Sequence, residues 1–199
     1  MFRCDIQREG IVRQSALDIY IVSLLDRGFE TSYALQRRGG LSVGSTIPAL
    51  QRLAAAGLVR KTGGATSSNR PRHGYQLSAA GRKLARTGWK AYLKAPGHLD
   101  LDAVLRVADV AQHYGAGAKE IASFLDAAAS DRRSSGRLRI SKPNEAGDSF
   151  EHMAMQGAWK GFRLKAEAKF LAGLAKSVMS GDTRSPKTGL RLRAGVARR

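Results

Sequence analysis

Residues 42–62 have the sequence SVGSTIPALQRLAAAGLVRKT, and the expected fold depends most on them. Ser42 is predicted to cap a helix that runs to about Ala56, and Gly57 closes it. The apolar positions of this helix are four, three and three residues apart and are expected to form its buried face: Val43, Ile47, Leu50 and Leu53. The residues that follow, 58–62, have the composition of a short strand.

Pro48 lies inside this predicted helix, where its ring would meet the carbonyl of residue 44 and where it offers no N–H for a hydrogen bond. Residue 44 is glycine, which lets the backbone relax locally. The alternative is a shorter helix that begins near Pro48, with Thr46 or Ser45 as its cap. In either case the outward face carries small or hydroxyl-bearing side chains and one arginine, Arg52.

Two helices are predicted upstream of this stretch. The first begins at Ser15 and stops at Gly28, and its apolar face consists of Leu17, Ile21, Leu24 and Leu25. Thr31 is expected to cap a second, short helix over residues 32–38, which Gly39-Gly40 ends. Residues 1–13 show no clear period and are expected to form a short arm.

A β-hairpin and a fourth helix are predicted downstream. The strands are residues 58–62 and 75–77, separated by a segment rich in Gly, Ser, Asn and Pro. Ser78 is expected to cap a helix that ends at Pro96-Gly97, where a domain boundary is predicted. One side of this helix is apolar and consists of Leu84, Ala85, Trp89, Tyr92 and Leu93.

The second half of the chain is predicted to be helical. Helices are expected over residues 101–114 and 118–133, followed by a loop over 134–148. The last helix, residues 149–180, has apolar or small residues at alternating steps of four and three, the spacing of helix-on-helix packing. Residues 181–199 are basic with few apolar side chains and are expected to be disordered.

These elements predict a mainly α fold with a small β-hairpin wing. The order helix, short helix, turn, helix, β-hairpin is that of a winged helix-turn-helix DNA-binding domain, expected over residues 14–95 after the arm of residues 1–13. Three helices alone bury too little surface, so the hairpin would cover their open side and project a loop toward the DNA backbone. Residues 98–180 are then a C-terminal helical dimerisation domain, and 181–199 a basic tail.

The charge distribution points to a polyanionic partner. The chain contains 34 Lys and Arg against 16 Asp and Glu, a net charge of +18. No Asp or Glu occurs from Thr31 to Leu99, although basic residues occur throughout that segment. A solvated face is the alternative, but such faces mix both signs of charge, whereas a segment of one sign is typical of a surface that meets phosphate groups.

Candidate DNA contacts are predicted on the third helix and at the hairpin tip. With Val43, Ile47 and Leu50 buried, the third helix would present small side chains and one arginine to the major groove. At the tip, two guanidinium groups flank a rigid proline and could enter the minor groove, although a flexible unbound loop would look similar. The predicted DNA-contacting residues are Arg38, Ser42, Ser45, Thr46, Ala49, Arg52, Lys61, Asn69, Arg70, Arg72 and His73.

The same residues resemble the PadR-like family of transcription regulators. That family's signature is a glycine, a stretch ending in Pro-Ala-Leu, then Arg-Leu and Gly-Leu-Val. It is matched here by Gly44-Ser45-Thr46-Ile47-Pro48-Ala49-Leu50-Gln51-Arg52-Leu53 and Gly57-Leu58-Val59. The family's wing motif is similar to Asn69-Arg70-Pro71-Arg72 and Tyr75-Gln76-Leu77-Ser78, with Gly81 as its later glycine.

Three positions depart from the family pattern. The family has tyrosine at the positions of Ile47 and Gly74 and glycine at the position of Asn69, and the absence of the first tyrosine removes an expected phosphate contact. The second half is similar to a longer PadR-like subfamily in which C-terminal helices form the dimer, through the pattern of Glu167, Phe170 and Leu171. The resemblance therefore implies a dimeric winged helix-turn-helix regulator.

The last helix is the predicted dimerisation element, because its apolar stripe would pair with a second copy of the chain. Packing within one chain is the alternative. The effector responses of the family also imply a pocket for a flat effector lined by Trp89 and Trp159, with core packing of the two rings as the alternative. The predicted dimerisation residues are Phe150, Gly157, Gly161, Leu164, Ala168, Leu171 and Val178.

The sequence predicts neither catalysis nor a metal or other cofactor, because its four histidines lie in unrelated contexts and no phosphate-cradling glycine loop occurs. A single cysteine, with no signal-peptide pattern and no long apolar run, predicts a cytoplasmic protein. The predicted function is that of a sequence-specific double-stranded DNA-binding transcription regulator, expected to repress, which acts as a homodimer on an inverted-repeat operator. The rival is a sequence-indifferent nucleic-acid binder, nucleoid- or RNA-associated.

Overall fold

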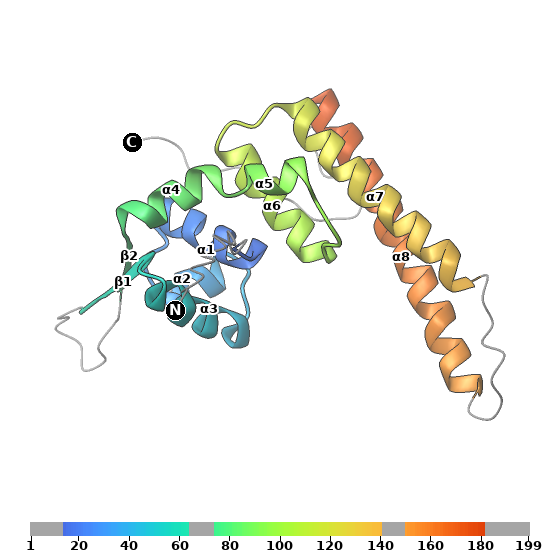
Figure 1. Cartoon of the computed structure of the whole chain (residues 1–199), viewed down its shortest axis with the longest axis horizontal. Coiled ribbons are helices and arrows are strands. Elements are labelled where there is room, and N and C mark those ends of the chain that lie inside the picture. The colour runs from blue at the N-terminus through green and yellow to red at the C-terminus, as the bar shows by residue number, and fades with distance from the viewer. Residues whose placement is uncertain (1–13, 64–73, 141–149, 182–199) are drawn as a thin grey trace, which may run out of the picture. The chain divides into compact units, whose positions relative to one another are not determined.

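The computed structural model describes residues 14–63, 74–140 and 150–181 (Figure 1). These residues are mainly helical and include one two-stranded antiparallel hairpin. The chain divides into two compact units, residues 1–82 and 83–199, here called the N-terminal and C-terminal units. The division falls inside a helix, upstream of Pro96-Gly97. None of the described helices is long and apolar enough to cross a membrane.

The first three helices begin after hydroxyl-bearing residues, as predicted. Each side-chain oxygen accepts a hydrogen bond from the backbone N–H three residues later, at 3.1 Å for Ser15, 3.1 Å for Thr31 and 3.2 Å for Ser42. Pro48 lies inside the third helix, so the longer of the two alternatives for it is confirmed. The helices are α1 (Ala16–Asp26), α2 (Ser32–Arg37) and α3 (Val43–Ala55).

The predicted antiparallel hairpin is formed by β1 (Val59–Thr62) and β2 (Gly74–Leu77). Its base is held by Ser78, whose backbone N–H and hydroxyl both donate to the Leu58 carbonyl, at 3.0 and 3.2 Å. Gly81, in the first turn of α4 (Ala79–Thr87), packs on the same carbonyl, where a Cβ atom would clash. The hairpin base is therefore fixed against the start of α4.

The core of the N-terminal unit includes the packed faces of α1 and α3. Leu50 and Leu53 are buried as predicted. Leu35 of α2 and Val59 of β1 also belong to this core. The turn between α3 and β1 contains Gly57, whose φ of +68° favours glycine. The fully or almost fully buried side chains of the core include Ile19, Ile21, Val22, Leu35, Leu50, Leu53 and Val59.

The buried face of α3 differs from the predicted one. Thr46 and Ala49 are completely buried, whereas Val43 is 63% exposed and Ile47 36% exposed. The prediction that Val43 and Ile47 belong to the core is therefore wrong. Two physical reasons favour the observed face: Thr46 and Ala49 are small enough for close helix packing, and the Thr46 hydroxyl is satisfied because it donates to the Ser42 carbonyl at 2.6 Å.

The single helix predicted over residues 78–94 is two helices. α4 ends at Thr87, and α5 (Lys90–Lys94) follows after Gly88, a poor helix former. The Thr87 hydroxyl donates to the Lys83 carbonyl at 2.9 Å, a bond that bends helices. Trp89, at the start of α5, is buried and donates its indole N–H to the Arg86 carbonyl at 2.9 Å.

The C-terminal unit contains α6 (Leu101–His113), α7 (Ala118–Ile140) and α8 (Phe150–Ser180). α6 and α8 confirm their predicted ranges closely. α7 is longer than predicted and includes the first part of the predicted loop over 134–148, of which residues 141–148 lie outside the described part. α7 and α8 lie side by side in opposite directions and form the most extensive helix pair of the unit (Figure 1).

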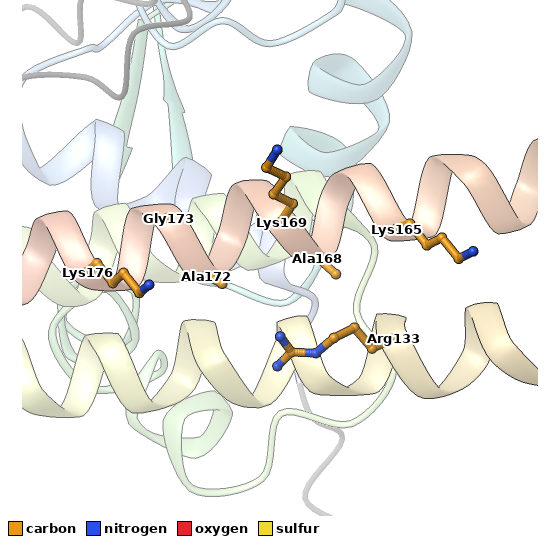
Figure 2. A pocket seen from close by; sticks show the side chains of 7 residues that line it. All are labelled: Arg133, Lys165, Ala168, Lys169, Ala172, Gly173 and Lys176. Atoms are coloured by element: carbon orange, nitrogen blue, oxygen red, sulfur yellow. The ribbon is translucent and has the colours of Figure 1, made fainter.

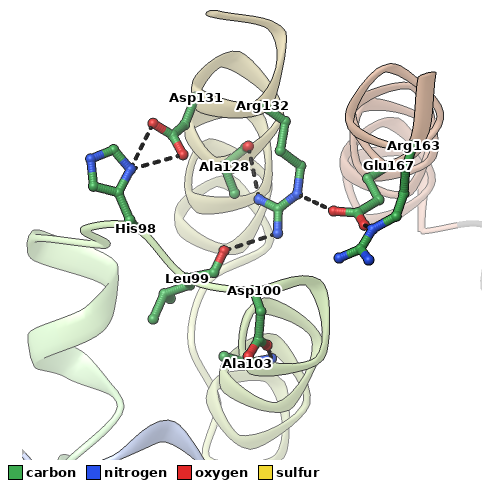
Figure 3. Close-up of polar contacts among 9 residues, drawn as sticks. All are labelled: His98, Leu99, Asp100, Ala103, Ala128, Asp131, Arg132, Arg163 and Glu167. Carbon is green, nitrogen blue, oxygen red and sulfur yellow. Dashed lines mark hydrogen bonds and ion pairs between the residues drawn. The ribbon is translucent and has the colours of Figure 1, made fainter. Parts of the chain in front are cut away.

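Arg132 of α7 ties this helix pair to the start of α6 (Figure 3). Its Nε donates to Glu167 Oε2 of α8 at 2.8 Å, and its Nη2 donates to the carbonyl of Leu99 at 3.0 Å. A third bond joins Nη1 to the Ala128 carbonyl at 3.1 Å. Because the Arg132 side chain is only 4% exposed, all of these bonds are made in the interior of the unit.

Glu167 is ionised within this network. Burial raises the pKa of its carboxyl, but hydrogen bonds and charge from Arg132 and Arg163 outweigh that effect and hold the pKa below its ordinary value. The Arg163 Nε donates to Glu167 Oε1 at 2.9 Å from one helical turn away. The carboxylate therefore neutralises a buried guanidinium and an exposed one at the same time.

Candidate nucleic-acid interface

The exposed surface of α3 is the candidate reading face of the N-terminal unit. It begins at Ser42 and Ser45, whose hydroxyl oxygens lie 2.9 Å apart in a hydrogen bond. Val43, Ile47 and Gln51 follow along the helix and are exposed. Ser42 and Ser45 are short enough to allow close approach of the helix to the floor of the major groove, where the apolar Val43 and Ile47 can contact thymine methyl groups.

Two of the predicted contact residues do not belong to this surface. Thr46 and Ala49 were expected at the edge of the outward face, but both are completely buried. They are removed from the candidate contacts because neither side chain has surface left for a partner. Val43, Ile47 and Gln51 replace them, and sequence reasoning missed all three, since α3 has more apolar positions than one face can bury.

Arg52, the only long donor predicted on this helix, has a partner within the unit. Its Nη2 donates to Asp18 Oδ1 of α1 at 2.9 Å. The Asp18 side chain is 8% exposed and the Arg52 side chain 55% exposed. The guanidinium is thus held at one end by α1 and still presents surface to solvent. No local sequence pattern predicts this ion pair, because Asp18 and Arg52 are 34 residues apart.

The other predicted contacts of the N-terminal unit have two different outcomes. Arg38, at the C-terminal end of α2, and Lys61, on β1, are exposed beside further basic residues, Arg37 and Arg60. The hairpin-tip residues lie outside the described part of the chain: Asn69, Arg70, Arg72 and His73. Tyr33 of α2 is also largely exposed and was not predicted as a contact.

The predicted dimerisation seam of α8 packs mainly against α7 of the same chain. Gly161, Ala168 and Leu171 are buried in the C-terminal unit, and the Gly161 carbonyl and Leu164 Cβ each lie 3.7 Å from the position of a Cβ built on Gly136 of α7. Intramolecular packing, the alternative considered for this seam, thus accounts for its buried positions. Gly157, Leu164 and Val178 are half-buried, and the Phe150 side chain is outside the described part.

The two tryptophans predicted to line an effector pocket lie in different surroundings. Trp89 is buried in the C-terminal unit, whereas Trp159 is 63% exposed on α8. Trp159 stacks on Phe162, with ring centroids 6.0 Å apart. The buried ring serves as core packing, and the exposed pair forms an apolar surface on the side of α8 that α7 does not cover.

Among the residues that the structure describes, no three His, Cys, Asp or Glu side chains gather as a metal site would require. The chain matches no model of a known protein family and no curated protein sequence. The functional conclusion therefore depends on the geometry and charge of the chain itself.

Proposed function

We propose that this chain is a sequence-specific double-stranded DNA-binding transcription regulator, in which α2 and α3 form a helix-turn-helix and the β1–β2 hairpin forms a wing. The observation that carries this proposal is the outer face of α3. It combines exposed Val43, Ile47 and Gln51 with the hydroxyls of Ser42 and Ser45, and none of these side chains is acidic. The motif resemblance to PadR-like regulators supports the same function.

The α3 face would read bases through two kinds of contact. Gln51 has the amide geometry for two hydrogen bonds to adenine, and Val43 and Ile47 have the apolar surface to contact thymine methyl groups. The exposed cations around α3, among them Arg38 and Lys61, would bind phosphates and set the orientation of the helix in the groove. Affinity would come largely from these cations and sequence choice from α3.

Homodimerisation is part of this proposal. The stacked, exposed Trp159 and Phe162 support a dimer contact on the open side of α8, since exposed aromatic pairs are typical of protein interfaces. A two-fold dimer would bind an inverted repeat whose half-sites are separated by about one helical turn or a multiple of it. Occupation of such a site would repress transcription by excluding other proteins.

A selection from random duplexes tests this function. The wild type is expected to enrich an inverted repeat, and Gln51→Ala is expected to lose about 1–3 kcal/mol of discrimination at one base position in each half-site. Gln112→Ala, an equivalent change on the exposed side of α6, serves as the matched control and is expected to keep the wild-type preference.

The competing function is that of a sequence-indifferent nucleic-acid binder, which the net charge of +18 favours. It predicts tight binding with a steep salt dependence and little difference between duplex sequences. If the wild type enriches no inverted repeat in the same selection, the regulator proposal is wrong and this function replaces it.

A further inference from the structure

A groove runs between α7 and α8 in the C-terminal unit, with a volume of about 520 Å³ (Figure 2). Its floor contains the small residues Ala172 and Gly173. Its walls carry four basic side chains: Arg133 from α7, and Lys165, Lys169 and Lys176 from α8. None of the sequence predictions included these cations.

The four cations have no acidic counterpart in the groove. All are exposed, no ion pair within the described residues involves any of them, and no acidic side chain lines the groove. Glu167, the acidic residue of α8 nearest in sequence to Lys165 and Lys169, is already bonded to Arg132 and Arg163. The groove therefore concentrates positive charge that a bound anion would neutralise.

The spacing of the lysines favours an extended anion over a small one. Lys165 and Lys176 are eleven residues apart on one helix, so a rise of about 1.5 Å per residue separates their backbones by roughly 16 Å. A single phosphate reaches only a part of that length. A nucleic-acid strand carries phosphates along its whole length and can meet every cation of the groove.

The chemistry of the groove also favours contacts to the backbone over contacts to bases. Lysine ammonium groups are mobile point charges, which bind phosphates without the fixed fork that reads guanine. The small residues Ala172 and Gly173 leave room for a strand to approach the helices. Contacts of this kind add affinity and salt dependence but no sequence preference.

We infer that the α7–α8 groove is a second nucleic-acid contact, which binds the phosphate backbone of duplex DNA through Arg133, Lys165, Lys169 and Lys176. This inference rests on the proposed function in its choice of DNA as the partner. It adds a site in the C-terminal unit, separate from the residues of α3, and assigns to it affinity without sequence choice.

The first test measures the salt dependence of binding with the full-length chain. The variant Lys165→Gln, Lys169→Gln is compared with Lys119→Gln, Lys160→Gln, which removes the same charge from exposed lysines outside both the groove and the acid-free segment of residues 31–99. For the groove variant, the slope of log K against log salt is expected to decrease by about 0.9 for each lysine that contacts a phosphate. Equal slopes for the two variants would overturn the inference.

The selection from random duplexes, combined with the salt slope, distinguishes failure of this inference from failure of the proposed function. If the wild type selects an inverted repeat and the groove variant selects the same repeat with a smaller salt slope, both stand. A smaller slope in a protein that selects no repeat would support the groove and refute the regulator. An unchanged slope in a protein that does select a repeat would refute the groove alone.

A second measurement needs no variant and so does not depend on how substitutions affect folding. An amine-acylating reagent is applied to the wild type with and without duplex DNA, and each lysine is quantified by mass spectrometry. Lys165, Lys169 and Lys176 are expected to be protected by DNA, and Lys119 to react unchanged. Equal reactivity with and without DNA, or full protection by inorganic phosphate alone, would overturn the assignment to a DNA strand.

Discussion

Two arginine–carboxylate pairs, one in each unit, join helices that are distant in sequence, yet they differ in burial. Asp18 and Arg52 link α1 to α3 at 2.9 Å, and Arg132 and Glu167 link α7 to α8 at 2.8 Å. The Arg132 side chain is almost completely enclosed, whereas more than half of the Arg52 side chain is exposed. The same chemical pair therefore serves two different purposes.

The two purposes follow from the partners of the other nitrogens of each guanidinium group. Arg132 uses its other nitrogens on the carbonyls of Ala128 and Leu99, so every bond serves the packing of the C-terminal unit. Arg52 is held by Asp18 at one nitrogen and still presents surface beside the candidate reading face of α3. A buried pair fixes helices, and a half-exposed pair can also orient an arginine toward a ligand.

The largest expected effect is that of Arg132→Ala. Removal of one member of a buried pair leaves Glu167 enclosed without its main partner, and the expected loss of unfolding free energy is about 3–5 kcal/mol. Both tryptophans of the chain, Trp89 and Trp159, lie in the C-terminal unit, so their fluorescence during urea unfolding reports this loss. The double variant Arg132→Met, Glu167→Leu should recover most of it, and a loss below about 1 kcal/mol in the single variant would refute the structural role.

A smaller effect on this pair is expected from acid, because protonation of Glu167 removes its charge but leaves both side chains in place. Its pKa is lower in the folded than in the unfolded protein, so its contribution is complete above the ordinary glutamate pKa and is lost as the pH falls through the folded value. Urea unfolding followed by tryptophan fluorescence across this range should show stability decreasing with acid. In Glu167→Gln that decrease should be smaller, and an identical pH profile in wild type and variant would contradict the assignment.

Asp18→Asn is expected to have an intermediate to small effect in the N-terminal unit. A hydrogen bond to a charged group contributes about 1.5–3 kcal/mol, and the exposed Arg52 can regain water in the variant. Amide hydrogen exchange in α1 and α3 should therefore be faster, and the DNA affinity should decrease because Arg52 loses the contact that orients it. Asp102→Asn, which affects an exposed pair in α6, is the control and should leave exchange in α1 and α3 unchanged.

The smallest effect is expected from Arg163→Ala. Arg163 contacts the same carboxylate as Arg132, but its side chain is exposed and it lies one turn away on the same helix. Such pairs contribute about 0.3–0.5 kcal/mol, a tenth of the effect expected for Arg132. Tryptophan-detected urea unfolding in low and high salt measures this difference. A loss of unfolding free energy as large as that of Arg132→Ala would show that the difference in exposure does not determine what the two arginines contribute to stability.

Most helix starts were predictable, because their cause is local. Ser15, Thr31 and Ser42 each cap a helix through a bond to an N–H three residues later, and the chemistry of such a cap is contained in four neighbouring residues. The hairpin strands and the ranges of α6 and α8 were predictable for the same reason, from turn residues and apolar spacing. The break at Gly88 was missed because an apolar stripe continues across it.

The tertiary structure alone decided which faces of these elements are used. The apolar spacing of α8 indicated that a helix packs on it, but only the folded chain shows that its own α7 occupies the buried positions. On α3, packing chose Thr46 and Ala49 for the interior over the larger Val43 and Ile47. The spacing of apolar residues shows which positions could be buried, whereas the shape of the element that packs on the helix determines which of them are buried. The acidic partners of Arg52 and Arg132 could not be predicted from the sequence either, because local sequence patterns do not relate residues more than thirty positions apart.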